Sequence, residues 1–314
     1  MVRARSVLMV LLLGGTVGCQ SVDNYSQGNM ALLRGDYELA IERSTKAIDS
    51  GSLLSSLRAD AYINRGDAYV ATRDYDRAVN DFSEAIKITP SAEAYNNRGA
   101  IYLVQAKYDL AIDDFTHAID AGSGRFIVEA TLGGYYMNRG IAYRRNGQLE
   151  QAIADYDEAA QLTPNDVRVY VDRATAHMAQ RRYDLAAADY TEAIRWEPMT
   201  AEHYNARCRA LILAGNPEQA VRDCDRALAL SPNDSPTLDW RGYAHYSAGD
   251  YGRAIADYDT ALRLNPYLAS SLYVRGLAKL RLGDTQNGNA DMDAAKKIDP
   301  EVGSKIDNLM AGFP

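Results

Sequence analysis

Small and aromatic residues recur along this chain at the spacing expected of amphipathic helices. Residues 61–69 read AYINRGDAY, and closely similar stretches occupy residues 94–102 and 135–143. Nine positions after each stretch comes a small residue, followed by an Asp-aromatic pair and another Ala. Apolar and small residues three, four and seven positions apart predict helices with one buried stripe. The small residues that mark the eight copies are Ala40, Ala78, Ala111, Ala152, Ala186, Ala220, Ala254 and Gly288.

The order of a small residue, an aromatic, a second small residue, a second aromatic and a closing Pro resembles the tetratricopeptide repeat. The resemblance covers residues 21–300 in eight copies. It implies two antiparallel helices per copy and an all-α, right-handed superhelical solenoid of about eight helix-turn-helix units. Because Pro cannot continue a helix, we expect each second helix to end before it. The closing prolines are Pro90, Pro164, Pro198, Pro232, Pro266 and Pro300.

Two junctions between copies are longer than the others. The interval between equivalent small residues is 38 residues from copy one to copy two and 41 from copy three to copy four, whereas each of the last four intervals is 34. The excesses amount to about one and two turns at ~3.6 residues per turn. Whole added turns keep the buried stripe on the same face. We therefore predict longer first helices in copies two and four, starting near Leu53 and Arg125.

The first nineteen residues have the features of an export signal. Arg3 and Arg5 precede an apolar run at 7–13, which is shorter than the roughly 20 residues that a membrane-spanning helix needs. The closing tetrapeptide Thr16-Val17-Gly18-Cys19 resembles a lipobox, where a signal is cut before a lipid-modified Cys, although Thr16 replaces the usual Leu. The alternative is ordinary signal cleavage beside an incidental Cys.

The lipobox resemblance implies a domain organisation. Residues 1–18 form a lipoprotein signal peptide and 19–23 a lipid-anchored tether, followed by the repeats at 24–300 and a C-terminal capping segment at 301–314. Several acyl chains on Cys19 would anchor the chain stably in a membrane. Because Gln20 rather than Asp follows Cys19, the resemblance favours the periplasmic face of the outer membrane in the cell envelope.

Composition and charge narrow the range of partners. Hydrophobic residues make up 47% of the chain and charged residues 24%, which is typical of a folded protein. The formal charge of −8 leaves little to neutralise phosphates, so we predict no nucleic-acid partner. Tyr outnumbers Phe by 22 to 4, which predicts aromatic rings close to a surface where their hydroxyl groups reach water.

An Arg and an Asp recur together in copies two to eight. The Arg precedes the small residue of the first helix, and the Asp precedes the aromatic residue of the second helix. A catalytic dyad is needed once, whereas a structural ion pair is useful in every copy. We therefore predict salt bridges within or between copies, for example Arg139 with Asp114 or Asp155. Copy one has Gln27 and Arg43 instead, as expected of a capping repeat that lacks one neighbour.

No constellation in the sequence points to catalysis. The four histidines do not cluster, and His177 and His245 stand where other copies have Tyr. The chain has no Cys-rich or His-rich metal spacing, no Gly-rich phosphate loop and no nucleophile beside a base. We therefore predict no enzymatic activity, no metal site, no cofactor and no small-molecule substrate.

Two cysteines fall at facing positions of copy six. Cys208 takes the small position of the first helix, and Cys224 takes the aromatic position of the second. These positions are level in an antiparallel hairpin, and disulfides persist in the oxidising compartment that an exported protein meets. Two interpretations stay open, a Cys208–Cys224 disulfide and two buried reduced thiols at small-residue positions.

The first helices should line the concave face of the solenoid, where such arrays bind peptides or partner helices. Equivalent positions on that face hold Asn64, Asn97, Asn138 and Asp172, which resembles the asparagine ladder of some peptide-binding tetratricopeptide superhelices. An amide side chain can both donate to and accept from a bound peptide backbone. We therefore predict that this row holds a partner segment.

The row becomes apolar towards the C-terminus. Trp240 continues it in copy seven, with Tyr243 on the same face. We predict an apolar patch that anchors the partner through these two residues. The alternative is that Trp240 packs under residues 301–314 and caps the array. The other expected members of the patch are Ala206, Leu213, Val274 and Leu277.

The sequence as a whole predicts an adaptor of the bacterial cell envelope that binds a partner peptide or helix in its concave groove. The rival hypothesis is a fixed structural subunit of an outer-membrane or pilus/secretion assembly complex. A conspicuous open groove would favour the adaptor, whereas a large apolar patch on the convex side would favour the fixed subunit. An enzyme would require a pocket with convergent polar groups.

Overall fold

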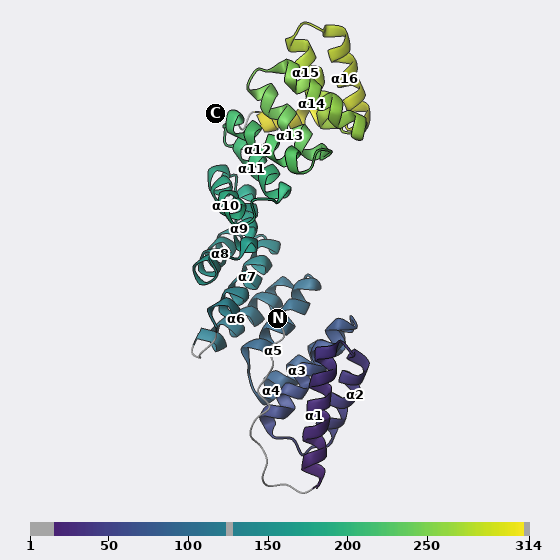
Figure 1. Cartoon of the computed structure of the whole chain (residues 1–314), viewed down its shortest axis with the longest axis vertical. Coiled ribbons are helices and arrows are strands. Elements are labelled where there is room, and N and C mark those ends of the chain that lie inside the picture. The colour runs from purple at the N-terminus through teal and green to yellow at the C-terminus, as the bar shows by residue number, and fades with distance from the viewer. Residues whose placement is uncertain (1–15, 124–127, 311–314) are drawn as a thin grey trace. The chain divides into compact units, whose positions relative to one another are not determined.

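The computed structural model describes residues 16–123 and 128–310 (Figure 1). Arg3, Arg5, the apolar run at 7–13, Arg125 and residues 311–314 lie outside the described residues. The described residues form seventeen α-helices and no strand. The helices are α1 (Thr16–Arg34), α2 (Tyr37–Asp49), α3 (Ser55–Ala71), α4 (Tyr75–Ile88), α5 (Ala92–Val104), α6 (Tyr108–Ser123), α7 (Glu129–Arg145), α8 (Leu149–Leu162), α9 (Val167–Ala179), α10 (Tyr183–Trp196), α11 (Ala201–Leu213), α12 (Pro217–Leu230), α13 (Ser235–Ser247), α14 (Tyr251–Leu264), α15 (Ala269–Arg281), α16 (Thr285–Ile298) and α17 (Val302–Met310).

Consecutive helices pair as the repeat pattern predicts, so that α1 and α2 form copy one and α15 and α16 form copy eight. A single residue with positive φ makes the turn inside each copy, where the chain reverses direction. Five of these residues are Gly, which adopts that conformation without strain. The eight residues are Gly35, Arg73, Ala106, Gly147, Arg181, Gly215, Gly249 and Gly283.

The helix pairs of copies two, three, four and seven pack closely because a Gly on the first helix faces an aromatic ring on the second. A Cβ added to Gly66 would meet the Phe82 ring at 2.8 Å, and one added to Gly140 would meet the Tyr156 ring at 2.7 Å. Real Cβ atoms do not approach other atoms so closely, so only Gly fits at these positions without movement of the ring. The alternation of small and aromatic residues in the sequence therefore marks the packing interface of these helix pairs.

The first helices of copies two and four are longer than those of copies three, five, six, seven and eight, as predicted, and only α1 of copy one, with 19 residues, is longer still. Helices α3 and α7 each contain 17 residues, whereas α5, α9, α11, α13 and α15 each contain 13. They begin at Ser55 and Glu129, slightly later than the predicted starts near Leu53 and Arg125. Leu53 is buried against Tyr25 in the core of copy one, which holds the chain before α3 begins. Part of the excess in the second long junction lies in α6, which has 16 residues.

Residues 19–23, the predicted lipid-anchored tether, are helical. They belong to α1, in which Ser21 and Tyr25 are already buried. Ser52 Oγ donates a hydrogen bond to Ser21 Oγ at 2.8 Å, which joins the start of α1 to the segment before α3. Packing against copy one therefore begins two residues after Cys19, at the position where the repeat resemblance begins.

The chain divides into two compact units, Met1–Thr163 and Pro164–Pro314, here called unit 1 and unit 2. Unit 1 contains copies one to four and unit 2 contains copies five to eight together with α17. Helix α17 packs on α15 and α16 through buried Val302 and Ile306, so part of the predicted capping segment covers the last copy. No helix among the described residues is both long enough and apolar enough to span a membrane.

Candidate protein-binding surfaces

All seven recurring Arg residues form the predicted salt bridges, and of the two arrangements left open by the sequence, within a copy or between copies, each Arg binds the Asp of its own copy. In each pair the Arg Nε and Nη2 groups donate to the two oxygens of a carboxylate sixteen residues later. The carboxylates are buried and the guanidinium groups are largely covered. The pairs are Arg65–Asp81, Arg98–Asp114, Arg139–Asp155, Arg173–Asp189, Arg207–Asp223, Arg241–Asp257 and Arg275–Asp291.

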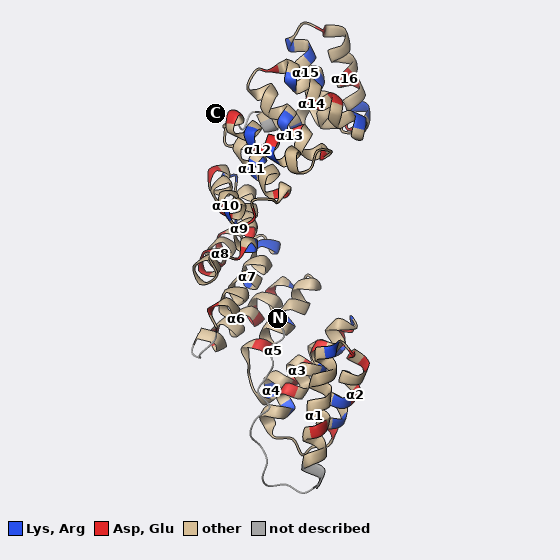
Figure 2. Cartoon of the chain, in the orientation of Figure 1, with Lys and Arg blue, Asp and Glu red and all other residues tan. Residues whose placement is uncertain are grey.

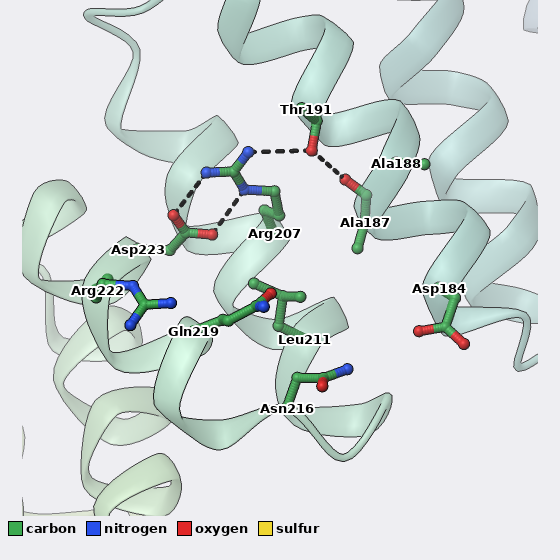
Figure 3. A pocket seen from close by; sticks show the side chains of 10 residues that line it. All are labelled: Asp184, Ala187, Ala188, Thr191, Arg207, Leu211, Asn216, Gln219, Arg222 and Asp223. Carbon is green, nitrogen blue, oxygen red and sulfur yellow. Dashed lines mark hydrogen bonds and ion pairs between the residues drawn. The ribbon is translucent and has the colours of Figure 1, made fainter.

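The third guanidinium nitrogen links neighbouring copies. Arg139 Nη1 donates to Thr116 Oγ1 of copy three at 3.1 Å, and Arg207 Nη1 donates to Thr191 Oγ1 of copy five at 3.0 Å, as Figure 3 shows for Arg207. These acceptors were not predicted from the sequence. Thr116 and Thr191 stand two residues after the paired Asp of the preceding copy, and other copies also have a polar residue at this repeat position. The other contacts that follow this pattern are Arg65 to Thr45, Arg98 to Ser83, Arg241 to Asp225 and Arg275 to Asp259.

The electrostatics of the pairs are those of buried structural contacts. Burial raises the pKa of the Asp81 and Asp155 carboxyls, against the opposing effect of the paired Arg. Hydrogen bonding to Asp155 raises the pKa of Arg139. Asp291 is less buried, and although burial would raise its pKa, hydrogen bonds from Arg275 and Lys279 lower it. Every pair joins helices of the array, and none is singled out as a catalytic dyad.

The row of asparagines is engaged inside unit 1 rather than presented to solvent. Asn138 Nδ2 donates to Asn96 Oδ1 at 2.8 Å, Asn96 Nδ2 donates to Asn97 Oδ1 at 3.2 Å, and Asn97 Nδ2 donates to Asp67 Oδ1 at 2.9 Å. This chain of hydrogen bonds crosses α7, α5 and α3. Asn64 is buried, so its amide cannot line an open groove. The prediction that Asn64 is exposed to a partner is therefore wrong, and Asn97 and Asn138 use part of their bonding capacity within the protein.

Beside the Asn97–Asp67 hydrogen bond lies a small groove, which we call the unit 1 groove. Its volume is about 280 Å³ and its walls come from α3, the start of α4 and α5. Val104 is 67% exposed and Val70 stands across from it on α3. The groove therefore combines a polar end with apolar walls open to solvent. Its lining residues are Asp67, Val70, Tyr75, Asn97, Ala100, Ile101 and Val104.

The C-terminal half of the predicted binding row lies in unit 2, where it is mostly buried. Tyr243 and Val274 belong to the core of this unit, so the prediction that they form an exposed apolar patch is wrong. Both lie between successive first helices, where packing removes them from solvent. Trp240 is half-buried, makes an edge contact with the Tyr243 ring and carries the Arg209 guanidinium over its own ring at 5.5 Å. Asp172 is half-buried on α9.

Cys208 and Cys224 are joined in the structure, with their Cα atoms 5.6 Å apart. Both are fully buried between α11 and α12. In the neighbouring copy seven, Gly242 and Tyr258 occupy the same two positions and are in close contact. The cysteine pair therefore replaces the contact between Gly and an aromatic ring in copy six.

A second hollow lies in unit 2, beside the Arg207–Asp223 ion pair, and it was not predicted from the sequence. Its volume is about 460 Å³, and α10, α11 and α12 line it (Figure 3). The cause is visible in the sequence. Ala187 follows the repeated small residue of copy five, where Val79, Ile112 and Ile255 follow it in other copies. Leu211 likewise replaces a larger aromatic side chain.

Polar groups line this hollow, but they do not form a reactive arrangement. The Arg207–Asp223 ion pair and Thr191 form one side, and all three groups already bond to one another or to the Ala187 carbonyl. Arg222 stands at the rim on α12 (Figure 3). Among the described residues, no group of three or more His, Cys, Asp or Glu side chains could hold a metal ion. The hollow is explained by smaller side chains at two repeat positions.

Charged residues of both signs are interspersed along both units, as Figure 2 shows. Many of them pair within one helix, as Lys46 does with Glu42 and Lys87 with Glu84. Such exposed pairs contribute little to stability. The described surface therefore offers a partner short-range polar contacts and a few apolar sites. Among these apolar sites, the unit 1 groove lies on the face that the sequence predicts to bind a partner.

Comparisons with known proteins place the fold. The C-terminal part of a TPR repeat-containing protein from Cytophaga hutchinsonii superposes with a TM-score of 0.65 at 18% sequence identity, covering 79% of this chain and 98% of that chain. A tetratricopeptide repeat protein from Parabacteroides merdae superposes with a TM-score of 0.56, also at 18% identity, covering 80% of this chain and 98% of that one. These structures share the all-α repeat solenoid with this chain.

Curated relatives match shorter stretches. The small glutamine-rich tetratricopeptide repeat-containing protein 2 of Saccharomyces cerevisiae is 43% identical over 65 residues, which is 21% of this chain and 18% of that protein. Heat shock protein STI1 of the same yeast is 38% identical over 72 residues, which is 23% of this chain and 12% of that protein. The chain therefore spans less than a fifth of the length of each of these relatives.

Two family models match the repeats themselves. One, described as TPR repeat, matches residues 140–181 and 242–283, and the other, described as tetratricopeptide repeat, matches residues 63–125 and 171–235. The matched ranges contain the four Gly–aromatic contacts and four of the seven Arg–Asp pairs, namely Arg65–Asp81, Arg98–Asp114, Arg173–Asp189 and Arg207–Asp223. On these grounds the chain belongs to the tetratricopeptide repeat family.

Proposed function

We propose that this chain is a lipid-anchored adaptor of the bacterial cell envelope that binds a partner peptide or helix through the unit 1 groove. Tetratricopeptide repeat proteins generally mediate protein–protein interactions, and nothing in the described residues suggests a catalytic group. The observation that carries the proposal is the unit 1 groove, which opens beside Val70 and Val104 on the predicted face. The lipobox resemblance at residues 16–19 supports the location.

The groove can accommodate an apolar side chain of the partner while the partner's backbone forms a hydrogen bond at the polar end. Ala100, Val70 and Val104 supply apolar contact, and the Asn97–Asp67 hydrogen bond closes the polar end. A carboxylate can accept from more than one donor, so a backbone N–H of the partner can share Asp67 with Asn97. A groove of this size accommodates one or two side chains, so further contacts along the array would be needed for tight binding.

Replacing Val104 by Ser should weaken partner binding by roughly tenfold, because burial of one aliphatic side chain contributes about 1.5 kcal/mol. The fold should not change, since Val104 is an exposed residue at the end of α5. A photo-crosslinking residue at position 104 would identify the partner in envelope preparations, and titration of the purified partner would then measure the affinity.

Leu282→Ser provides the matched control, because Leu282 is a similarly exposed aliphatic side chain directly after α15 of unit 2. It should leave the affinity unchanged. If Val104→Ser binds the crosslinked partner as tightly as the unaltered chain does, the unit 1 groove is not the binding site.

The membrane location has its own test. Cys19 is exposed near the start of α1, where modification of its thiol meets no packed side chain. Replacing Cys19 by Ala should abolish labelling with a radioactive fatty acid and move the mature protein from the membrane fraction to the soluble fraction, since acyl chains supply ~0.8 kcal/mol per buried CH₂. An unaltered chain that takes up no fatty acid would refute the anchor and leave the groove proposal standing.

A further inference from the structure

Unit 2 exposes large apolar side chains along one of its edges. The segments that join one copy to the next form this edge, which we call the junction edge. Met199 is 69% exposed there and Tyr267 is 76% exposed. Trp196, Leu264 and Ile298, the last residues of α10, α14 and α16, are also exposed. The turns inside the copies form the opposite edge of the described part of unit 2. On that edge, the only exposed large apolar side chains are Leu185 and Leu282.

The exposed residues of the junction edge recur at the same repeat positions. Residues 196–199 read WEPM after α10, and residues 264–267 read LNPY after α14. In each case an apolar residue ends the helix and another follows the Pro. Copy six departs from this, because residues 230–233 read LSPN and Leu230 is half-buried. Fold requirements do not explain exposed Met199 and Tyr267, since polar Asn serves at the same position in copy six.

Basic side chains accompany the apolar ones. The Arg195 guanidinium lies over the Trp196 ring at 5.8 Å, and Arg226 Nη2 contacts Met199 Sδ at 3.6 Å. Arg263 and the Lys296–Lys297 pair stand in the last turns of α14 and α16, close to Leu264 and Ile298 in sequence. Acidic groups lie on the same edge as well. Glu192 pairs with Arg195, Glu197 contacts the His203 ring, and Asp299 pairs with Lys305.

We propose that the junction edge of unit 2 lies shallowly in the headgroup region of a lipid bilayer. Trp and Tyr are the residues that proteins place at the membrane–water interface, because an apolar ring and a polar tip suit its two sides. Basic side chains next to them contact lipid phosphates while their aliphatic stems cover apolar surface. The inference rests on the proposed lipid anchor, which would bring the chain to a membrane.

The two tryptophans of the chain make the test direct. Trp240→Phe leaves Trp196 as the only fluorophore of this kind. Cys19 is the one cysteine outside the disulfide, so the full chain can be coupled through its thiol to a maleimide lipid, whether or not cells acylate it. The coupled protein is placed on vesicles of phosphatidylethanolamine and phosphatidylglycerol that contain brominated acyl chains, which quench only nearby tryptophan.

Helix α10 supplies a matched control. Leu185 lies near its first residue and is 49% exposed, close to the 46% of Trp196 at its last residue. A chain with Leu185→Trp, Trp196→Phe and Trp240→Phe therefore moves the reporter to the opposite edge of the same helix. We expect brominated lipid to remove about half or more of the Trp196 emission and to leave the emission at position 185 nearly unchanged.

The outcomes separate the edge from the anchor. If lipid-coupled protein shows no quenching at Trp196, or equal quenching at both positions, the inference is overturned and the edge belongs to a protein surface. Because coupling is chemical, this result does not depend on fatty-acid labelling at Cys19, which tests the anchor separately. In the Trp240→Phe chain, Met199→Ser with Tyr267→Ser should reduce quenching at Trp196, whereas Leu282→Ser should not.

Discussion

Replacing Arg139 by Ala is expected to lower the free energy of unfolding by about 3 to 5 kcal/mol. The loss comes mainly from Asp155, which stays buried without the two hydrogen bonds that it accepts from Arg139. Thr116 also loses its bond to Arg139, so the contact between copies three and four weakens. Urea denaturation followed by circular dichroism would measure the change.

The control is a double replacement of the same pair, Arg139→Met with Asp155→Leu. It removes both charges and keeps much of the volume, and replacing a buried ion pair by apolar residues is often close to neutral. We therefore expect the double variant to be clearly more stable than Arg139→Ala alone. Equal destabilisation in the two variants would mean that packing of the Arg side chain, and not its charge, holds these copies together.

Loss of the Cys208–Cys224 bond should lower stability by about 3 kcal/mol, the value expected for a closed loop of this length. The two residues are sixteen positions apart, so the bond closes the hairpin of α11 and α12. Adding a thiol reductant should therefore lower the melting temperature of the unaltered chain. Cys208→Ser with Cys224→Ser should melt at the lower temperature whether or not reductant is present.

A second variant separates the bond from the packing that it replaces. Cys208→Gly with Cys224→Tyr restores the residues that copy seven uses at Gly242 and Tyr258. It should recover part of the lost stability and no longer respond to reductant. An unaltered chain whose melting temperature is the same with and without reductant would show that the disulfide contributes nothing to stability.

The repeat pattern predicted most of the fold because each copy is stabilised by local contacts. Gly66 and Phe82 are sixteen residues apart and still in contact, as are Arg65 and Asp81. Contacts of this range leave a regular trace in the sequence, so the helix pairs, the longer α3 and α7 and the seven ion pairs could be predicted. The Cys208–Cys224 geometry follows the same spacing, but spacing alone could not choose between a bond and two thiols.

The binding surfaces were predicted less well, because exposure depends on neighbouring copies. Asn64 and Tyr243 occupy the predicted face of their helices, yet adjacent first helices cover both. Asn97 is reached by Asn96 and Asp67, an arrangement that the spacing within one copy does not reveal. Val104 lies on the same predicted face and stays exposed, because it ends α5 beyond the reach of the next helix.

The sequence was sufficient to predict the all-α repeat architecture and the recurring Arg–Asp pairing, and it supplies the lipobox resemblance at residues 16–19 on which the proposed lipid anchor rests. Those features depend on residues within one copy or one short motif. Only the tertiary structure decided which face residues remain open, that α1 packs from Ser21 onwards, and that Ala187 leaves a hollow beside α12. The reason is that the exposure of a side chain depends on the side chains of adjacent copies. How far those side chains cover it is fixed only when the helices pack.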